Sequence, residues 1–146
     1  MEGKSLKVGF TGTQLGMTPL QLQAFEKLIE QWNIQEFHHG DCVGADYEAH
    51  ESVFGLSTCA IVIHPPLNNK ARAFCAGSAE HDVSILPARP YLDRNKDIVN
   101  QTDRLIACPH GIKEELRSGT WSTVRFARKQ GKPVTIIFPD GNVEQG

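Results

Sequence analysis

The sequence predicts an α/β fold with a mainly parallel, five-stranded sheet. Short, continuously apolar segments alternate with segments in which apolar residues recur every three or four positions. This pattern is typical of buried parallel strands that alternate with amphipathic helices. Right-handed crossovers between such strands place the loops that follow them at one edge of the sheet. The 146 residues suffice for one sizeable core, so we expect a single domain over 1–146.

The helices and strands alternate along most of the chain. The predicted strands are 6–11, 34–39, 59–64, 105–109 and 134–138. The predicted helices are the segment after Thr18, residues 45–54, residues 91–101, and the segment from the Ser118 turn to Gly131. The first helix has the clearest signals, because Thr18 suits the N-cap and Pro19 suits the first helical position. Gly131 is a typical end for the last helix.

In three segments the apolar residues do not recur at a regular spacing. The stretch 68–86 is typical either of a lid over a ligand or of a surface excursion with a short strand at 83–86. Residues 110–117 form a polar insert before the last helix. The tail after Phe138 is expected to form a turn and to fray by Gly146.

The overall composition excludes several classes of protein. A net charge of −2 and a pI near 6.3 give no electrostatic footprint for nucleic acid or for an anionic membrane. The sequence shows neither a signal peptide nor an apolar run long enough to span a membrane. The four cysteines are scattered without paired spacing, which is typical of reduced, buried thiols. We therefore expect a cytoplasmic protein.

The loops after the predicted strands form the candidate site. They are 11–16, 40–46, 64–66 and 109–120, and glycines and hydroxyl residues concentrate in the first, second and fourth. In parallel α/β sheets, ligands lie beyond these strand ends. The Ser118-Gly119-Thr120 turn offers free N–H groups, hydroxyls and the positive end of a helix dipole, which suits a phosphate. The alternative is an ordinary capped helix with Ser118 or Thr120 as its N-cap.

Five histidines and aspartates lie close together in the sequence and are of residue types that bind metal ions. They are His38, His39, Asp41, Asp46 and His50. Adjacent strand residues point to opposite faces, so His38 and His39 cannot easily join one site. We therefore predict no metal centre.

Three fragments resemble the SLOG superfamily, a Rossmann-like group that includes DprA, the LOG phosphoribohydrolases and the YspA-like proteins. Residues 39–46 resemble its glycine-rich turn, Arg94-Asn95 resembles its "RN" helix, and Ser118-Gly119-Thr120 with Thr123, Ala127 and residues 131–134 resembles its "SGT…T…A…GKPV" block. The resemblance covers about residues 6–139. It implies a Rossmann-like three-layer sandwich with strand order 3-2-1-4-5, a nucleotide or nucleotide-derived ligand, and a homo-oligomer, either a dimer or a tetramer.

The resemblance and the loop chemistry together assign ligand contacts. The phosphate contacts are expected from Thr11, Gly12, Thr13, Ser118, Gly119 and Thr120. Gly40, Gly44 and Asp46 are expected to shape the sugar side, and the other expected ligand-binding residues are Asp41, Ala45, His64 and Thr123. Arg94 offers charge-assisted hydrogen bonds to phosphate, and Asn95 a neutral contact. Trp121 either stacks on a base or packs in the core.

The chain departs from the LOG enzymes at the expected catalytic position. Those enzymes carry a glutamate three residues after the turn threonine, and this chain has Thr123. The leading hypothesis is therefore a non-catalytic module that senses or sequesters a nucleotide-derived small molecule and needs no cofactor. The alternative is a nucleoside-monophosphate phosphoribohydrolase that uses Asp41, Asp46 or Glu115 as its carboxylate. A weaker third possibility is a protein-interaction subunit in nucleic-acid processing.

Overall fold

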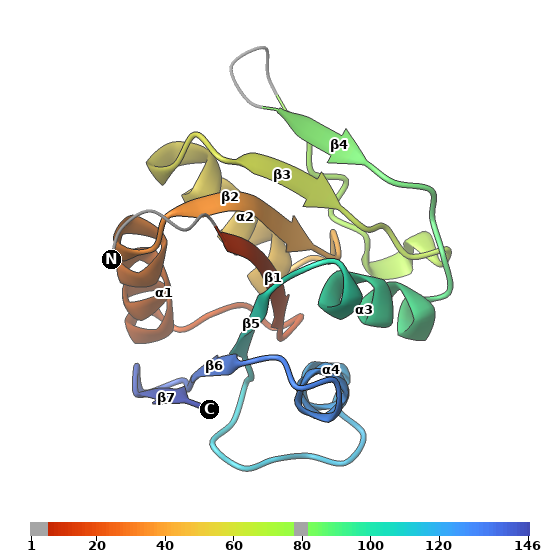
Figure 1. Ribbon diagram of the computed structural model, residues 1–146. Helices are drawn as coiled ribbons and strands as arrows, with labels where there is room; N and C mark the ends of the chain where they lie inside the picture. The colour runs from red at the N-terminus through yellow and green to blue at the C-terminus, as the bar shows by residue number, and fades with distance from the viewer. Residues whose placement is uncertain (1–5, 78–81) are drawn as a thin grey trace.

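The computed structural model describes residues 6–77 and 82–146, and these residues build one sheet between two pairs of helices (Figure 1). The sheet has seven strands in the order β4-β3-β2-β1-β5-β6-β7. All neighbouring strands are parallel except β6 and β7. The strands are β1 (Leu6–Gly12), β2 (Ile34–His39), β3 (Ala60–Ile63), β4 (Val83–Ile85), β5 (Arg104–Cys108), β6 (Val134–Ile137) and β7 (Val143–Gln145).

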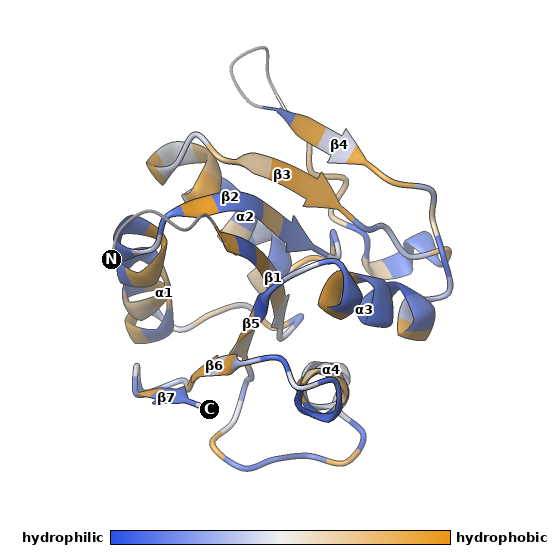
Figure 2. Ribbon diagram, in the orientation of Figure 1, coloured by the Kyte–Doolittle hydropathy of each residue, from blue (hydrophilic) through white to orange (hydrophobic). Residues whose placement is uncertain are grey.

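Four α-helices in the described residues cover the two faces of the sheet. They are α1 (Pro19–Gln31), α2 (Ala45–Leu56), α3 (Tyr91–Asn100) and α4 (Gly119–Lys129). Apolar residues of α1 and α2 pack on one face around Phe10 and Phe37, and those of α3 and α4 pack on the other around Leu105 and Ile136. The hydropathy colouring shows hydrophobic strands such as β3 beside helices, such as α1 and α3, that mix hydrophobic and hydrophilic residues (Figure 2). This arrangement is a Rossmann-like α/β fold.

The sheet corrects the predicted strand count of five to seven, and two edge strands extend the predicted order 3-2-1-4-5. The predicted five strands lie in the middle of the sheet, and β4 and β7 add one strand at each edge. The tail does not fray at Gly146, because Gly146 and Val134 exchange two backbone hydrogen bonds of 2.9 and 2.7 Å. Sequence periodicity could not reveal β7, because its three residues are exposed and it forms only by pairing with β6.

The segment 68–86 contains a short strand rather than a lid, as far as it is described. Residues 83–85 form β4, residues Asn69–Ala71 form a single 3₁₀ turn (η1), and residues 78–81 lie outside the described residues. Arg72 forms an isolated antiparallel bridge with Cys42. The segment therefore packs against the loop that follows β2.

The N-caps predicted for the first and last helices are confirmed. Thr18 caps α1, accepting from the Gln21 N–H at 3.0 Å, while the Gln21 side chain accepts from the Thr18 N–H at 3.2 Å. Ser118 caps α4 and accepts from the Trp121 N–H at 3.2 Å. Within the described residues, no helix is long and apolar enough to cross a membrane.

Candidate functional site

A cleft of about 380 Å³ lies at the carboxyl ends of the central strands, beside α3 and the start of α4. The predicted site residues that line it are Thr11, Gly12, Thr13, Gly40, Asp46, Arg94, Asn95, Glu115, Ser118, Gly119 and Thr120. The predicted residues that do not line it are Asp41, Gly44, Ala45, His64, Trp121 and Thr123. The structure thus brings the three glycine- and hydroxyl-rich loops to one cleft. The role of these residues in binding a ligand stays a prediction.

The start of α4 forms one wall of the cleft, through Ser118, Gly119 and Thr120. The first N–H groups of a helix have no intrahelical acceptor, so those of Gly119 and Thr120 are available at the positive end of the helix dipole. The Ser118 side chain occupies the next N–H, that of Trp121. The N-cap interpretation of this turn is confirmed for Ser118, whereas phosphate binding by Gly119 and Thr120, which line the cleft, stays a prediction.

The β1 loop forms the opposite wall, and it depends on glycines for its position. A Cβ on Gly12 would lie 2.5 Å from Ala45 Cβ, so a glycine is required where β1 meets α2. Gly44 has a φ of +86°, and a side chain there would collide with the Gln14 carbonyl. The Thr13 carbonyl accepts from the Ala45 N–H at 2.9 Å. Gly44 and Ala45 thus hold the loop behind the cleft, which corrects their predicted position in it.

Arg94 is a buried residue that lines the cleft, and most of its nitrogens already have protein partners. Its side chain is 5% exposed. Nη1 donates to the Gly40 carbonyl and, at 3.0 Å, to the His64 carbonyl, so Arg94 ties together the ends of β2 and β3. Nε donates to Asn95 Oδ1 at 2.8 Å. Nη2 lies 3.7 Å from Cys42 Sγ and is the nitrogen with the weakest protein contact.

Asp46 is the buried carboxyl group of the cleft. It is 5% exposed, and its Oδ2 accepts from the Cys42 N–H at 3.1 Å. Burial raises the pKa of Asp46 to about 6, although the Arg94 guanidinium and the backbone N–H groups act in the opposite direction. A carboxyl with this pKa changes its charge near neutral pH, so its ionisation also affects stability.

We expect the Asp46→Asn variant to show how this ionisation affects stability. The pKa of Asp46 in the folded state lies above its ordinary value of 3.8. The protonated Asp46 carboxyl therefore contributes fully to stability below pH 3.8, and this contribution is lost as the pH rises through about 6. Between pH 4.5 and 7.5 the wild type should lose about 2 kcal/mol of unfolding free energy relative to Asp46→Asn. Urea denaturation of both proteins measures this difference. The matched control is exposed Asp93→Asn, and a difference from Asp46→Asn that does not change with pH would contradict the assignment.

Asp41, one of the catalytic candidates, lies outside the cleft. It is fully buried with a φ of +60°. Its Oδ2 accepts from Arg72 Nε at 2.7 Å, and its Oδ1 accepts from the Cys75 N–H at 2.8 Å. The carboxylate therefore fixes the 72–75 segment against β2, and its position corrects its predicted place in the ligand site.

Three other predicted site residues are buried and contact other parts of the protein instead of lining the cleft. Trp121 is 5% exposed and packs near Phe138 with 6.5 Å between ring centroids, which is the core alternative of its two interpretations. The Thr123 hydroxyl donates to the Gly119 carbonyl at 2.9 Å and is buried. His64 is buried, and its Nε2 lies 2.8 Å from His38 Nδ1.

Several residues that line the cleft were not predicted from the sequence. They are Phe10, Gln14, Leu15, Cys42, Tyr91, Ile98 and His110. Gln14 and Leu15 belonged to a predicted site loop, but their side chains carried no recognisable phosphate chemistry. Tyr91 was visible only as the start of a helix, because nothing in the sequence shows that α3 begins beside Gly119.

The polar insert 110–118 folds back onto α4 and carries Glu115 to the rim of the cleft. Arg125 holds it, with Nη1 donating to Glu114 Oε2 at 2.8 Å and Nη2 donating to the Leu116 carbonyl at 2.9 Å. His110 Nε2 and Glu115 Oε2 lie 3.3 Å apart, and both side chains are substantially exposed. Of the three catalytic candidates, Asp46 and Glu115 therefore line the cleft.

Two histidine pairs lie on opposite faces of β2, as the strand geometry predicts. His38 contacts His64 on one face, and His39 contacts His50 on the other. Burial lowers the pKa of His38, lowers that of His39 well below its ordinary value, and lowers that of His64 to about 3. These rings are therefore neutral in the folded protein, and their contribution to stability is lost as the pH falls below about 6.5.

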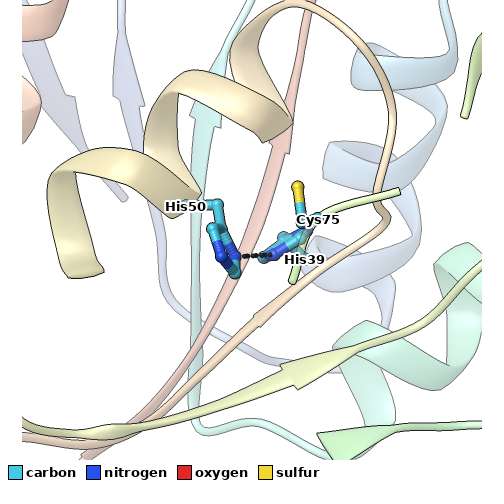
Figure 3. A group of neighbouring side chains, drawn as sticks. All are labelled: His39, His50 and Cys75. Atoms are coloured by element: carbon cyan, nitrogen blue, oxygen red, sulfur yellow. Dashed lines mark hydrogen bonds between the residues drawn. The ribbon is translucent and has the colours of Figure 1, made fainter. Parts of the chain in front are cut away.

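His39, His50 and Cys75 form a compact buried group with ligand atoms within 4.8 Å of one another (Figure 3). The Asp41 N–H donates to His39 Nδ1 at 3.0 Å, which places the His39 proton on Nε2. His39 Nε2 then donates to His50 Nδ1 at 2.9 Å, and His50 Nε2 donates to the Ala76 carbonyl at 2.9 Å. Burial raises the pKa of Cys75, which disfavours the thiolate that a metal requires. This donor set fits a hydrogen-bonded structural group better than a metal site.

Comparison with solved structures supports the fold. The chain is similar to the molybdenum cofactor binding protein from the phototrophic bacterium Rippkaea orientalis, with 23% identity, a TM-score of 0.65, and coverage of 94% of this chain and 78% of that chain. It is also similar to TM1055, with 17% identity, a TM-score of 0.58, and coverage of 88% and 71%. No protein-family model and no curated protein matches the sequence. At these identities the similarity shows a shared Rossmann-like α/β fold.

Proposed function

We propose that the chain binds a phosphorylated, nucleotide-type small molecule in the cleft. The observation that carries the proposal is the free helix N-terminus at Gly119 and Thr120, which faces a cleft lined by the hydroxyls of Thr11, Thr13 and Ser118. Helix N–H groups and hydroxyls together match the oxygens of a phosphate. The position beyond the ends of parallel strands is the usual ligand position in this class of fold.

The fold comparison and the sequence resemblance support the same proposal. One structural neighbour is described as a molybdenum cofactor binding protein, which is a small-molecule binder with the same architecture. The SLOG-like fragments at residues 39–46 and at Ser118-Gly119-Thr120 both border the cleft. We assign the chain to this superfamily, and to a role in sensing or sequestering its ligand.

The direct test compares nucleoside 5′-monophosphates with the corresponding nucleosides. Isothermal titration should detect binding of at least one monophosphate, and removal of its phosphate should weaken that binding at least about tenfold, because charge-assisted contacts are lost. Native mass spectrometry of the purified protein, followed by denaturation, identifies any ligand that copurifies. Equal binding of nucleoside and monophosphate, or no binding of either, would contradict the proposal.

Asp46 favours a second candidate function, which is hydrolysis of the N-glycosidic bond of a nucleoside monophosphate. The reaction breaks the bond between base and sugar, transfers a water oxygen to the sugar, and returns a proton to the base. A cleft carboxyl with a pKa of about 6 can exchange that proton near neutral pH. Chromatography of the base released by wild type and by Asp46→Asn distinguishes the two functions. Binding without release of base leaves the chain a binding protein.

A further inference from the structure

The aromatic side chains around the cleft differ in accessibility. Of the aromatic residues that line the cleft, Phe10 is 1% exposed, whereas Tyr91 is 50% exposed. Trp121, the aromatic that the sequence suggested for stacking, is buried in the core. Among the Phe, Tyr and Trp rings that line the cleft, Tyr91 is therefore the one that a ligand can reach.

Tyr91 stands directly beside the proposed phosphate position. Its Cε2 and Oη lie 3.6 and 4.0 Å from the point that a Cβ on Gly119 would occupy. The absence of a side chain at Gly119 thus leaves space between the Tyr91 ring and the start of α4. Among the described residues, no ring, cation–π or hydrogen-bond contact uses the Tyr91 ring.

Asn95, one helical turn after Tyr91, adds an oriented hydrogen-bond donor. Residues four apart share one helix face, and both residues line the cleft. Arg94 Nε can only donate, so the atom of Asn95 that it contacts at 2.8 Å must be the amide oxygen. The Asn95 NH₂ group is therefore left to donate to another partner.

We propose that Tyr91 is the platform on which a planar heteroaromatic ring of the ligand stacks, while its phosphate binds at Gly119 and Thr120. Asn95 donates to an acceptor atom on that ring or on its sugar. The inference rests on the proposed function and adds a heteroaromatic ring to the phosphate that the proposed function assigns to the ligand. The ligand class is then a heteroaromatic ring joined to a phosphate by a short linker, because the ring and the phosphate site adjoin the same glycine.

The test compares ligands with and without the ring. Isothermal titration uses AMP, GMP, CMP and UMP as ring-bearing probes and ribose 5-phosphate as the ringless probe. Tyr91→Leu should weaken the tightest monophosphate about 5- to 150-fold, the range measured for stacking of one base on an aromatic side chain. The same variant should bind ribose 5-phosphate as the wild type does. Tyr91→Phe should retain monophosphate binding, because it keeps the ring.

The matched control is Tyr47→Leu. Tyr47 is 46% exposed, lies on α2 and does not line the cleft, so its replacement should leave all the affinities unchanged. The base protons of the bound monophosphate should also show upfield ring-current shifts in the NMR spectrum of the wild type, and these should disappear in Tyr91→Leu.

The outcomes separate the two proposals. A wild type that binds neither monophosphates nor ribose 5-phosphate would overturn the proposed function and this inference with it. A wild type that binds monophosphates, with Tyr91→Leu binding them equally well, would overturn the stacking inference alone. Loss of binding in Tyr91→Phe would also overturn it, since the hydroxyl rather than the ring would then be the contact.

Discussion

Replacement of Gly119 by aspartate is expected to abolish binding of a phosphorylated ligand. The new carboxylate would stand at the first position of α4, where the free N–H groups face the cleft. Two like charges about 4 Å apart near a protein surface repel each other by roughly 4 kcal/mol, so affinity should fall at least about 100-fold. Isothermal titration with the monophosphate that binds the wild type most tightly measures the loss.

The same variant should fold normally, which makes the result informative. Gly119 does not have a positive φ, and a Cβ there would only reach ordinary contact with Tyr91 at 3.6 Å. An acidic residue in the first turn also stabilises a helix by about 0.3–1 kcal/mol. Thermal unfolding should therefore show no loss of stability.

Two further variants isolate the effect of the charge at Gly119. Gly119→Asn has nearly the same shape without the charge and should bind more tightly than Gly119→Asp. Gly55→Asp adds the same charge to a glycine in α2 that has open space around it, and it should bind as the wild type does. Unchanged binding in Gly119→Asp would place the phosphate elsewhere and would remove the main support for the proposed function.

Replacement of Asp41 by alanine is expected to give the largest loss of stability. The variant leaves the buried Cys75 N–H without its acceptor and Arg72 Nε without its carboxylate. Loss of the acceptor of a buried N–H costs about 1–3 kcal/mol, and the half-buried Arg72 loses its charged partner in addition. Chemical denaturation should show this decrease in unfolding free energy.

The control for Asp41 keeps its shape. Asp41→Asn retains an oxygen for the Cys75 N–H, and asparagine tolerates the φ of +60° better than alanine does. Its loss of stability should be clearly smaller than that of Asp41→Ala. If both variants unfold as the wild type does, the carboxylate does not hold the 72–75 segment.

The sequence predicted the elements whose own residues carry the signal. Burial can be predicted from the local sequence in four elements. These are β1, β5 and β6, which are continuously apolar, and α1, which has a periodic apolar face. The edge strands β4 and β7 were missed or left open, because each has only three residues and most of these are exposed. Such strands form because a neighbour supplies backbone partners, and that information lies elsewhere in the chain.

In the candidate site, too, some features were predicted from the sequence and others depend on tertiary contacts. The sequence by itself determined that glycine- and hydroxyl-rich loops follow the strands, because the alternation of elements fixes which loops meet at one edge of the sheet. Only the tertiary structure decided the position of each side chain. Asp41 and Trp121 became buried parts of the framework outside the cleft, whereas Tyr91, Arg94 and Asp46 line it. Burial and hydrogen-bond partners depend on packing between distant segments, so residue type and spacing could not determine them.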